Sequence, residues 1–331
     1  MLPTVGITYN AAYPVEDGVV RRALEGLAQI RMIEMPTERL DDDQEAAVAA
    51  TLRGVTALLV RPGYLPRSLL VRCHELRFIA MHAAGVDKVD FRATAELGIT
   101  VTYAPGGNAL GVAELTIAMA LLLVRQLVPT ISATKEGMWN QARRAGTELS
   151  GKTLGIIGVG RIGSLVAERA LAFGMHVVGN DPAFEPEEFA ARGLLWLPLD
   201  AVLESADLVT LHVPLDPSTA KMLDAAALRR MKPGAFLLNL ARGGVLDESA
   251  LEAALLDGHI AGAALDARET EPPPSVDTLR SLPNVIVTPH IGGSTDESLT
   301  RMAEMCAVEI QRFLVGKPPI NEASLDAVDA E

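Results

Sequence analysis

The 331-residue sequence contains few aromatic side chains, which make up 4% of it, and only two cysteines. Cys73 and Cys306 lie far apart in the chain and lack the spacing of paired metal ligands. We therefore expect no metal site and a reducing, cytoplasmic environment for the protein. Residues 1–4 lack a basic segment leading into an apolar core, so a signal peptide is not expected either.

Basic residues are also scarce: 29 lysines and arginines stand against 42 aspartates and glutamates, which leaves a formal net charge of −13. No basic stripe is visible, and this argues against nucleic acid or an anionic membrane as a partner. A small anionic substrate stays open, because a few local arginines are enough to bind one.

Residues 109–128 form an apolar run that approaches the length of a membrane-spanning helix. The run contains Glu114 and Arg125, and residues 106–108 precede it without a charged anchor. A helix that is apolar on most of its surface is also what a domain or subunit interface needs. We therefore expect a buried or interfacial helix here and no membrane partner.

The sequence is rich in aliphatic residues: hydrophobic side chains make up 49% of it, and few of them are aromatic. Short apolar runs alternate with helical segments along the chain. This rhythm predicts parallel sheets with helices on both faces, and the length allows two domains. The expected fold class is α/β, with two Rossmann-like, doubly wound parallel-sheet domains. The expected strands are residues 5–9, 30–35, 55–60, 78–81 and 99–102, then 153–157, 175–180, 208–212, 235–239, 262–265 and 285–288.

A glycine-rich turn joins the strand expected at residues 153–157 to an amphipathic segment. In its Gly-x-Gly-x-x-Gly pattern, Gly158 allows the tight turn, Gly160 lets a pyrophosphate approach the backbone, and Gly163 lets helix pack on strand. The N–H groups and the positive dipole end of the new helix would face the phosphates. The next strand ends in Asp181, which can accept hydrogen bonds from both ribose hydroxyls and would repel a 2′-phosphate. Together these features predict NAD, rather than NADP, as the cofactor.

The domain boundaries follow from where this pattern breaks. Residues 105–107 interrupt the strand–helix rhythm, and the last expected helix, residues 298–314, comes too late for the second sheet. We therefore expect an NAD-binding domain of residues 104–293. A discontinuous substrate-binding domain would consist of residues 1–103 plus 294–331.

Polar side chains follow three later strands of the second domain, at the edge where open α/β sheets bind ligands. They are Arg242, then Asp266 with Glu269 and Glu271, then His290. A guanidinium can hold a carboxylate bidentately and polarise an adjacent carbonyl, and an imidazole can donate or accept a proton near neutral pH. A carboxylate against the imidazole stabilises its charged form. Beside NAD, these groups predict the interconversion of a 2-oxo acid and a 2-hydroxy acid.

The sequence resembles the D-isomer-specific 2-hydroxyacid dehydrogenases over nearly its whole length. The segments that carry the resemblance are residues 84–87, 112–114, 158–163, 180–182, 212–215, 232–234, 239–247, 264–266 and 289–294. The resemblance implies an NAD-dependent oxidoreductase acting on a small 2-oxo acid or its D-2-hydroxy acid. It also implies a homodimer joined through the helix that begins near Gly111.

The resemblance also assigns roles to individual residues. Arg242 would orient the substrate's carboxylate and carbonyl, and His290 would be the proton donor. The glutamate paired with that histidine falls at Glu271, although Glu269 is two residues away and stays an alternative. The residues that the resemblance places at the cofactor, besides the glycines and Asp181, are Arg161, Ile162, Val213, Pro214, Leu240, Asp266 and His290.

In the first domain, the resemblance makes the turn of Ala84, Gly85 and Val86 a nest of backbone N–H groups for the substrate carboxylate. Arg61 lies where relatives that act on phosphoglycerate keep an arginine for a distal anionic group, and it is equally a candidate surface residue. The same relatives have arginine at the position of Met81. The sequence therefore leaves the particular substrate undefined.

Two other functions remain open. The family includes corepressors, so an NAD-sensing binding protein without turnover is the main alternative, although the sequence shows no docking extension of that kind. A related NAD enzyme such as a formate dehydrogenase fits less well, because a glutamate–histidine pair suits a 2-hydroxy acid better.

Overall fold

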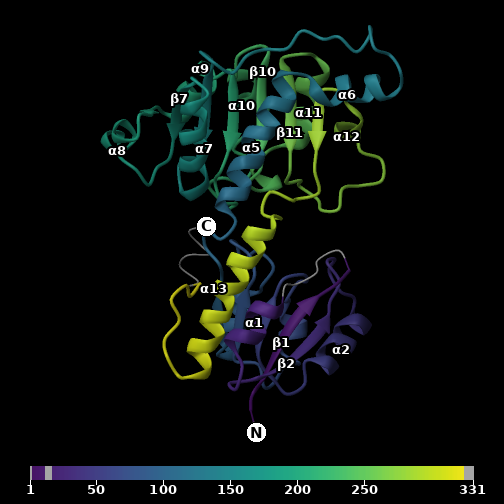
Figure 1. Ribbon diagram of the computed structural model, residues 1–331, viewed down its shortest axis with the longest axis vertical. Helices are drawn as coiled ribbons and strands as arrows, with labels where there is room; N and C mark the ends of the chain where they lie inside the picture. The colour runs from purple at the N-terminus through teal and green to yellow at the C-terminus, as the bar shows by residue number, and fades with distance from the viewer. Residues whose placement is uncertain (1, 12–16, 324–331) are drawn as a thin grey trace. The chain divides into compact units, whose positions relative to one another are not determined.

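The computed structural model describes residues 2–11 and 17–323, and the chain divides into two compact units (Figure 1). Unit 1 comprises Met1–Asn108 and Ser294–Glu331, and unit 2 comprises Ala109–Gly293. Among the described residues, unit 1 contains a five-stranded sheet and unit 2 a seven-stranded sheet, and every strand pairing in them is parallel. The expected fold class is confirmed.

In unit 1 the strand order is β2-β1-β3-β4-β5. The strands are β1 (Thr4–Tyr9), β2 (Gln29–Glu34), β3 (Val55–Val60), β4 (Phe78–Met81) and β5 (Thr100–Thr102). The helices are α1 (Asp17–Ala23), α2 (Asp42–Thr51), α3 (Arg67–Leu70), α4 (Phe91–Leu97) and α13 (Asp296–Leu314).

Each face of this sheet has its own hydrophobic core, because successive side chains of a strand point to opposite faces. Leu58 packs with residues of α2, α3 and α4, whereas its neighbours Ala57 and Leu59 pack with residues of α1 and α13. Figure 1 shows α1 and α13 beside each other in this unit. Burial on both faces explains why the strands read as continuous apolar runs.

In unit 2 the strand order is β12-β11-β10-β9-β6-β7-β8. The strands are β6 (Thr153–Ile157), β7 (His176–Asn180), β8 (Leu195–Trp196), β9 (Leu208–Leu211), β10 (Ala235–Asn239), β11 (Ile260–Leu265) and β12 (Val285–Val287). The helices are α5 (Ala109–Val124), α6 (Leu127–Lys135), α7 (Arg161–Ala172), α8 (Pro186–Ala191), α9 (Leu199–Ser205), α10 (Ala225–Arg230), the 3₁₀ helix η1 (Gly243–Val245), α11 (Glu248–Leu256) and α12 (Thr278–Ser281). Strand β8 was not expected from the sequence; it is only two residues long.

The second sheet is covered in the same way. Leu238 packs with residues of α5 and α7, and the adjacent Leu237 packs on the opposite face with residues of α9, α10 and α11. Strand order reverses at the neighbours β6 and β9, since β7 and β8 extend the sheet on one side and β10 to β12 on the other. A crevice at such a switch point is where open α/β sheets bind ligands.

The long apolar run forms α5 followed by α6, and most residues of α5 are buried in the core of unit 2. Within the described residues, a membrane-spanning length of apolar helix is reached only by taking α5 and α6 together, and the two are bent by 66° at their junction. The burial of Val112, Ile117 and Leu123 in the core agrees with the expected buried helix.

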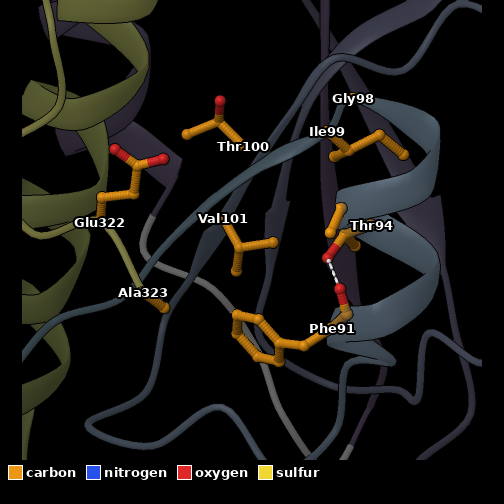
Figure 2. Close-up of a pocket in the computed structure, with 9 residues that line it drawn as sticks. Phe91, Thr94, Gly98, Ile99, Thr100, Val101, Glu322 and Ala323 are labelled. Atoms are coloured by element: carbon orange, nitrogen blue, oxygen red, sulfur yellow. Dashed lines mark hydrogen bonds between the residues drawn. The ribbon is translucent and has the colours of Figure 1, made fainter. Parts of the chain in front are cut away.

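A short terminal segment covers the edge of the first sheet. Glu322 forms an antiparallel bridge with Thr102, and the Ala323 N–H donates to the Val101 carbonyl oxygen at 2.9 Å. A pocket of about 350 Å³ lies here between β5, α4 and this segment. Figure 2 shows the residues that line it. Glu322 is the one charged residue in its lining.

Candidate active site

The carboxyl ends of β10, β11 and β12 lie side by side in unit 2. Asn239 pairs with Leu265, and Leu265 pairs with Val287, so the last residues of the three strands are in register. The segments carrying Arg242 and His290 leave the sheet directly after these ends. Parallel pairing therefore gathers side chains that are far apart in sequence at one edge.

His290 and Glu271 form a close pair at this edge. The His290 Nδ1 lies 2.9 Å from Glu271 Oε2 and 3.0 Å from Oε1. Because a carboxylate only accepts hydrogen bonds, Nδ1 carries the proton and Nε2 is left for another partner. Both side chains are partly exposed, at 45% and 40%, so a ligand can reach them. Glu269, the alternative partner, instead forms an ion pair with Lys221 at 3.3 Å.

Asp266 holds the loop that presents His290. Its Oδ1 accepts hydrogen bonds from Thr288 Oγ1 at 2.6 Å and Ile291 N at 2.8 Å, and its Oδ2 accepts one from Gly292 N at 2.8 Å. The residue is 3% exposed. His290 itself has a φ of 53°, a left-handed conformation that non-glycine residues rarely adopt without support from their surroundings. The sequence did not predict that Asp266 would fix this loop by hydrogen bonds, because the contact forms only when the loop after β12 folds back onto Asp266.

The turn that carries Arg242 is built around Asn239, a fully buried residue to which sequence reasoning gave no role. Asn239 Nδ2 donates to the Arg242 carbonyl oxygen at 3.0 Å, and its Oδ1 accepts from Ala241 N at 3.1 Å. The partly buried Arg242 donates from Nη1 to the Ala241 carbonyl oxygen at 3.0 Å. An asparagine at the end of a buried strand is the signal that could have revealed this turn.

The glycine-rich turn follows β6 and leads into α7. Gly158 has a φ of 89°, and a β-carbon there would lie 2.6 Å from the His212 carbonyl oxygen. A β-carbon at Gly163 would lie 2.1 Å from the Gly158 carbonyl oxygen, so these two positions need glycine for backbone packing. A β-carbon at Gly160 would meet no atom within 4 Å. The backbone at Gly160 therefore faces open space.

The residues around this turn fit a dinucleotide. A cavity of about 410 Å³ adjoins Gly160, and its lining is Val159, Gly160, Arg161, Ser164, Phe184 and Arg192. The open face of Gly160 and the start of α7 can receive a pyrophosphate. Asp181, at the tip of β7, accepts hydrogen bonds from Val159 N at 2.8 Å and Ala183 N at 2.9 Å. Each of its oxygens keeps further acceptor capacity for a ribose hydroxyl.

The other residues predicted to contact the cofactor lie at the same edge of the sheet. Arg161 and Ile162 are the first residues of α7. The partly buried Val213 and the exposed Pro214 follow β9, which pairs with β6, and the buried Leu240 follows β10. The structure thus gathers these residues along neighbouring strand ends, while their contacts with a cofactor stay a prediction.

The predicted substrate residues of unit 1 also follow neighbouring strands. Arg61 comes directly after β3, the turn 84–86 follows β4, and Val60 pairs with Met81 at the ends of these strands. His82 follows the last residue of β4 and precedes this turn. It is buried, and its Nε2 lies 2.9 Å from the Leu299 carbonyl oxygen. Burial, followed by the charge of Arg61, lowers the pKa of His82 to about 4. The imidazole is therefore neutral at physiological pH.

Metal-ligating side chains do not gather in the part of the chain that the structure describes, where no group of three or more His, Cys, Asp or Glu could hold an ion.

Comparison with known proteins places the chain among proteins of one family. Residues 117–292 match the family model described as D-isomer specific 2-hydroxyacid dehydrogenase, NAD binding domain. The D-3-phosphoglycerate dehydrogenase of Rattus norvegicus is 42% identical over 269 residues, which are 81% of this chain and 50% of that protein. The chain thus spans about half the length of this curated relative.

Two solved structures extend the similarity to nearly the whole chain. A protein of Thermus thermophilus is 34% identical with a TM-score of 0.85, covering 97% of this chain and 100% of that one. The D-lactate dehydrogenase of Aquifex aeolicus, complexed with NAD and lactic acid, is 32% identical with a TM-score of 0.79 and covers 94% and 96%. The chain therefore belongs to the D-isomer specific 2-hydroxyacid dehydrogenases.

Proposed function

We propose that this protein is an NAD-dependent oxidoreductase that interconverts a small 2-oxo acid and its D-2-hydroxy acid. The main support for the proposal is the pairing of His290 Nδ1 with Glu271 Oε2 at 2.9 Å. This pair and the turn that contains Arg242 both follow the carboxyl ends of neighbouring strands. An acid–base pair beside an arginine is what proton transfer to a carboxylate-bearing substrate requires.

The roles of the three side chains follow from their chemistry. Glu271 holds the proton on His290 Nδ1, so Nε2 can take a proton from the 2-hydroxyl group when the imidazole is neutral and return one to the carbonyl oxygen when it is charged. Arg242 offers a fork of N–H donors that can bind the substrate carboxylate and polarise the adjacent carbonyl. Holding the substrate this way converts the reaction into a positioned, effectively unimolecular step.

The proposed cofactor site lies in residues 104–293. Gly158, Gly160, Arg161, Ile162 and Gly163 would hold the pyrophosphate of NAD, and Asp181 would accept hydrogen bonds from the adenosine ribose. Val213 and Pro214 would flank the adenine, and Leu240 and Asp266 would lie near the nicotinamide. When bound, NAD supplies the hydride acceptor for oxidation and, in its reduced form, the hydride donor for reduction.

The proposed substrate-binding domain is residues 1–103 plus 294–331. We propose that the backbone N–H groups of Ala84, Gly85 and Val86 bind the substrate carboxylate and that Arg61 binds a second polar or anionic group. Several relatives are D-3-phosphoglycerate dehydrogenases, and several of the similar solved structures are D-lactate dehydrogenases, so phosphorylated and unphosphorylated acids are both candidates.

The test is a panel of 2-oxo acids assayed with NADH, comprising glyoxylate, pyruvate, hydroxypyruvate and 3-phosphohydroxypyruvate. We expect the wild-type protein to oxidise NADH with at least one of them, and His290→Ala to reduce kcat at least about a hundredfold. Arg61→Ala is expected to raise KM for the phosphorylated acid more than for pyruvate. Turnover by His290→Ala equal to that of the wild type would refute the proton-transfer role.

The same panel of 2-oxo acids distinguishes the enzyme from the alternative, an NAD-sensing, corepressor-like binding protein. A wild-type protein that binds NADH tightly and turns over none of the acids would favour the sensor. Turnover of any of them favours the enzyme.

We further propose a cytoplasmic homodimer joined through α5 and α6. Val128 and Ile131, three residues apart on α6, are 44% and 48% exposed, and Leu110 near the start of α5 is 42% exposed. Large apolar side chains exposed on two consecutive helices suit a surface that a partner covers. Both cysteines are free and buried, as suits a reducing compartment. Sedimentation velocity should give a dimer for the wild-type protein and a smaller species for Val128→Glu with Ile131→Glu.

A further inference from the structure

A cluster of buried charges lies beside the proposed catalytic pair, and the proposed reaction does not use it. Arg268 is 7% exposed. Its Nε and Nη2 donate to the two carboxylate oxygens of Glu248 at 2.9 Å each, and its Nη1 and Nη2 donate to Asp277 at 2.8 and 3.2 Å. The side chains of Glu248 and Asp277 are 15% and 5% exposed, so both ion pairs are shielded from solvent.

The guanidinium joins three segments of unit 2. Arg268 lies in the segment after β11, Glu248 is the first residue of α11, and Asp277 is the N-cap of α12. Glu248 Oε1 also accepts a hydrogen bond from Glu269 N at 2.8 Å. The backbone at 268–269 is thus fixed to α11 through the side chain and the main chain together.

The same backbone touches both parts of the proposed active site. Arg268 N donates to Glu271 Oε1 at 3.0 Å, and this oxygen lies 3.0 Å from His290 Nδ1. On the other side, a β-carbon at Gly243 would lie 2.0 Å from the Arg268 carbonyl oxygen, so the residue next to Arg242 packs directly on this peptide. A shift of Arg268 would therefore move the partner of His290 and the turn of Arg242.

Stability alone does not account for a cluster of this kind. Moving an arginine and two carboxylates out of water costs free energy that their attraction offsets only when the geometry is good, and well-packed apolar residues of similar volume often stabilise a protein as much. The four charge-assisted hydrogen bonds fix orientation more strictly than apolar contacts do. Orientation is what a carboxylate facing a catalytic imidazole requires.

We propose that Arg268 is a positioning residue, which holds Glu271 against His290 and supports the turn of Arg242 through its buried ion pairs with Glu248 and Asp277. The proposal rests on the proposed dehydrogenase function for its catalytic consequence. Its structural part, the orientation of the His290–Glu271 pair, can be measured without turnover.

The central variant removes the whole cluster, because Arg268→Met alone leaves two buried carboxylates without a counter-charge and is expected to unfold the protein. In Arg268→Met with Glu248→Gln and Asp277→Asn, no charge of the cluster remains, asparagine is still a good N-cap, and glutamine can still accept from Glu269 N. The matched control is Arg229→Met with Asp257→Asn, which removes an exposed ion pair of the same unit.

We expect the cluster variant to fold and to bind NADH within about twofold of the wild type. Its kcat should fall about 10-fold to 100-fold, because a misplacement of about 1 Å at a reacting group can cost about a hundredfold. The control should keep wild-type kcat and KM. A folded cluster variant with wild-type kcat would overturn the catalytic part of the proposal.

The structural part is tested by ¹⁵N NMR of histidine-labelled protein, with the His290 signals assigned from their absence in His290→Gln. Pairing with Glu271 should hold the wild-type imidazole in its Nδ1-protonated tautomer, and the cluster variant should shift it toward the Nε2-protonated form. An unchanged tautomer in the cluster variant would refute the positioning role. If the wild-type protein reduced none of the 2-oxo acids, the proposed function would fail while the tautomer measurement still decided the role of Arg268.

Discussion

At the scale of single residues, the three glycines of the glycine-rich turn have different roles although they share one motif. Gly158 and Gly163 lie against backbone oxygens that a β-carbon would strike, whereas Gly160 faces open space with a φ of −68° that alanine also adopts. The first two are therefore required by the fold. The third is required only if something must approach the backbone closely.

This difference makes a matched pair of substitutions informative. Gly160→Ala should fold with a free energy of unfolding within about 1 kcal/mol of the wild type, because its methyl group meets nothing. It should weaken NAD binding about tenfold or more by blocking the approach of the pyrophosphate. Gly163→Ala should lower the melting temperature instead. Isothermal titration with NAD and thermal unfolding measure the two effects, and wild-type affinity in Gly160→Ala would contradict the assignment.

Asp266 is the second residue with a decisive local role. Asp266→Ala removes the acceptor for Ile291 N, Gly292 N and Thr288 Oγ1, and we expect a loss of about 2–4 kcal/mol of stability because buried donors are left unpaired. The loop that presents His290 should also relax, so kcat should fall with it. Urea unfolding gives the first quantity. Asp200→Ala, which removes a carboxylate whose side chain is 60% exposed, is the control and should change stability by less than about 0.5 kcal/mol.

At the scale of elements, α13 supports the first sheet in two ways. Its apolar side chains pack on one face of the sheet, and Glu309, which is 1% exposed, anchors the segment that follows the helix. The Glu309 carboxylate accepts hydrogen bonds from Ile320 N at 3.0 Å and from Asn321 N and Nδ2 at 2.8 and 2.9 Å. This anchor places residues 322–323 along β5, where they pair with an otherwise open strand edge.

Replacing Glu309 should therefore open that edge. In Glu309→Ala the donors of residues 320–321 lose their acceptor, and we expect a cost of about 3 kcal/mol together with faster hydrogen–deuterium exchange of the Ala323 amide, which donates to Val101. Glu304→Ala, at an exposed position of the same helix, should leave both quantities unchanged. Unaltered exchange at Ala323 in Glu309→Ala would show that the carboxylate does not hold the segment.

At the scale of the whole molecule, the stability of the protein should depend on pH through a histidine that is neutral when folded. The pKa of His82 is lowered to about 4, first by burial and then by the charge of Arg61, from an unfolded value near 6.5. Between these values the unfolded chain binds a proton that the folded protein does not. The free energy of unfolding therefore falls as the pH decreases from about 6.5 to about 4. Above about pH 6.5 the protein has the full stability that the neutral His82 allows.

This dependence can be measured by urea unfolding at pH 7 and pH 5. The wild-type protein should lose about 2 kcal/mol through His82 over this interval, at about 1.4 kcal/mol per pH unit below 6.5. His82→Gln should lack that part of the loss, since glutamine does not titrate, whereas His176→Gln at an exposed position should keep it. Equal losses in His82→Gln and the wild type would contradict the buried, neutral imidazole.

Much of the fold could be predicted because its signals are local. A strand buried on both faces reads as a short apolar run, so all described strands longer than two residues were expected to within two residues of their ends. Strand β8 was missed because Leu195–Trp196 is too short to show a period. The terminal pairing of residues 322–323 with β5 was missed because it depends on Glu309, a residue of a helix, and on no pattern of its own.

The sequence by itself determined the parallel α/β architecture, the glycine turn with its acidic partner at the next strand tip, and the kinds of side chain at each strand end. The resemblance placed the partner of His290 at Glu271, with Glu269 two residues away as the alternative, and only the tertiary structure shows that Glu271 faces His290 while Glu269 pairs with Lys221. We attribute that choice to Arg268, Glu248 and Asp277, which come from three different segments. Local periodicity encodes the elements, whereas the pairing of side chains in a loop is set by contacts that exist only after those elements have packed.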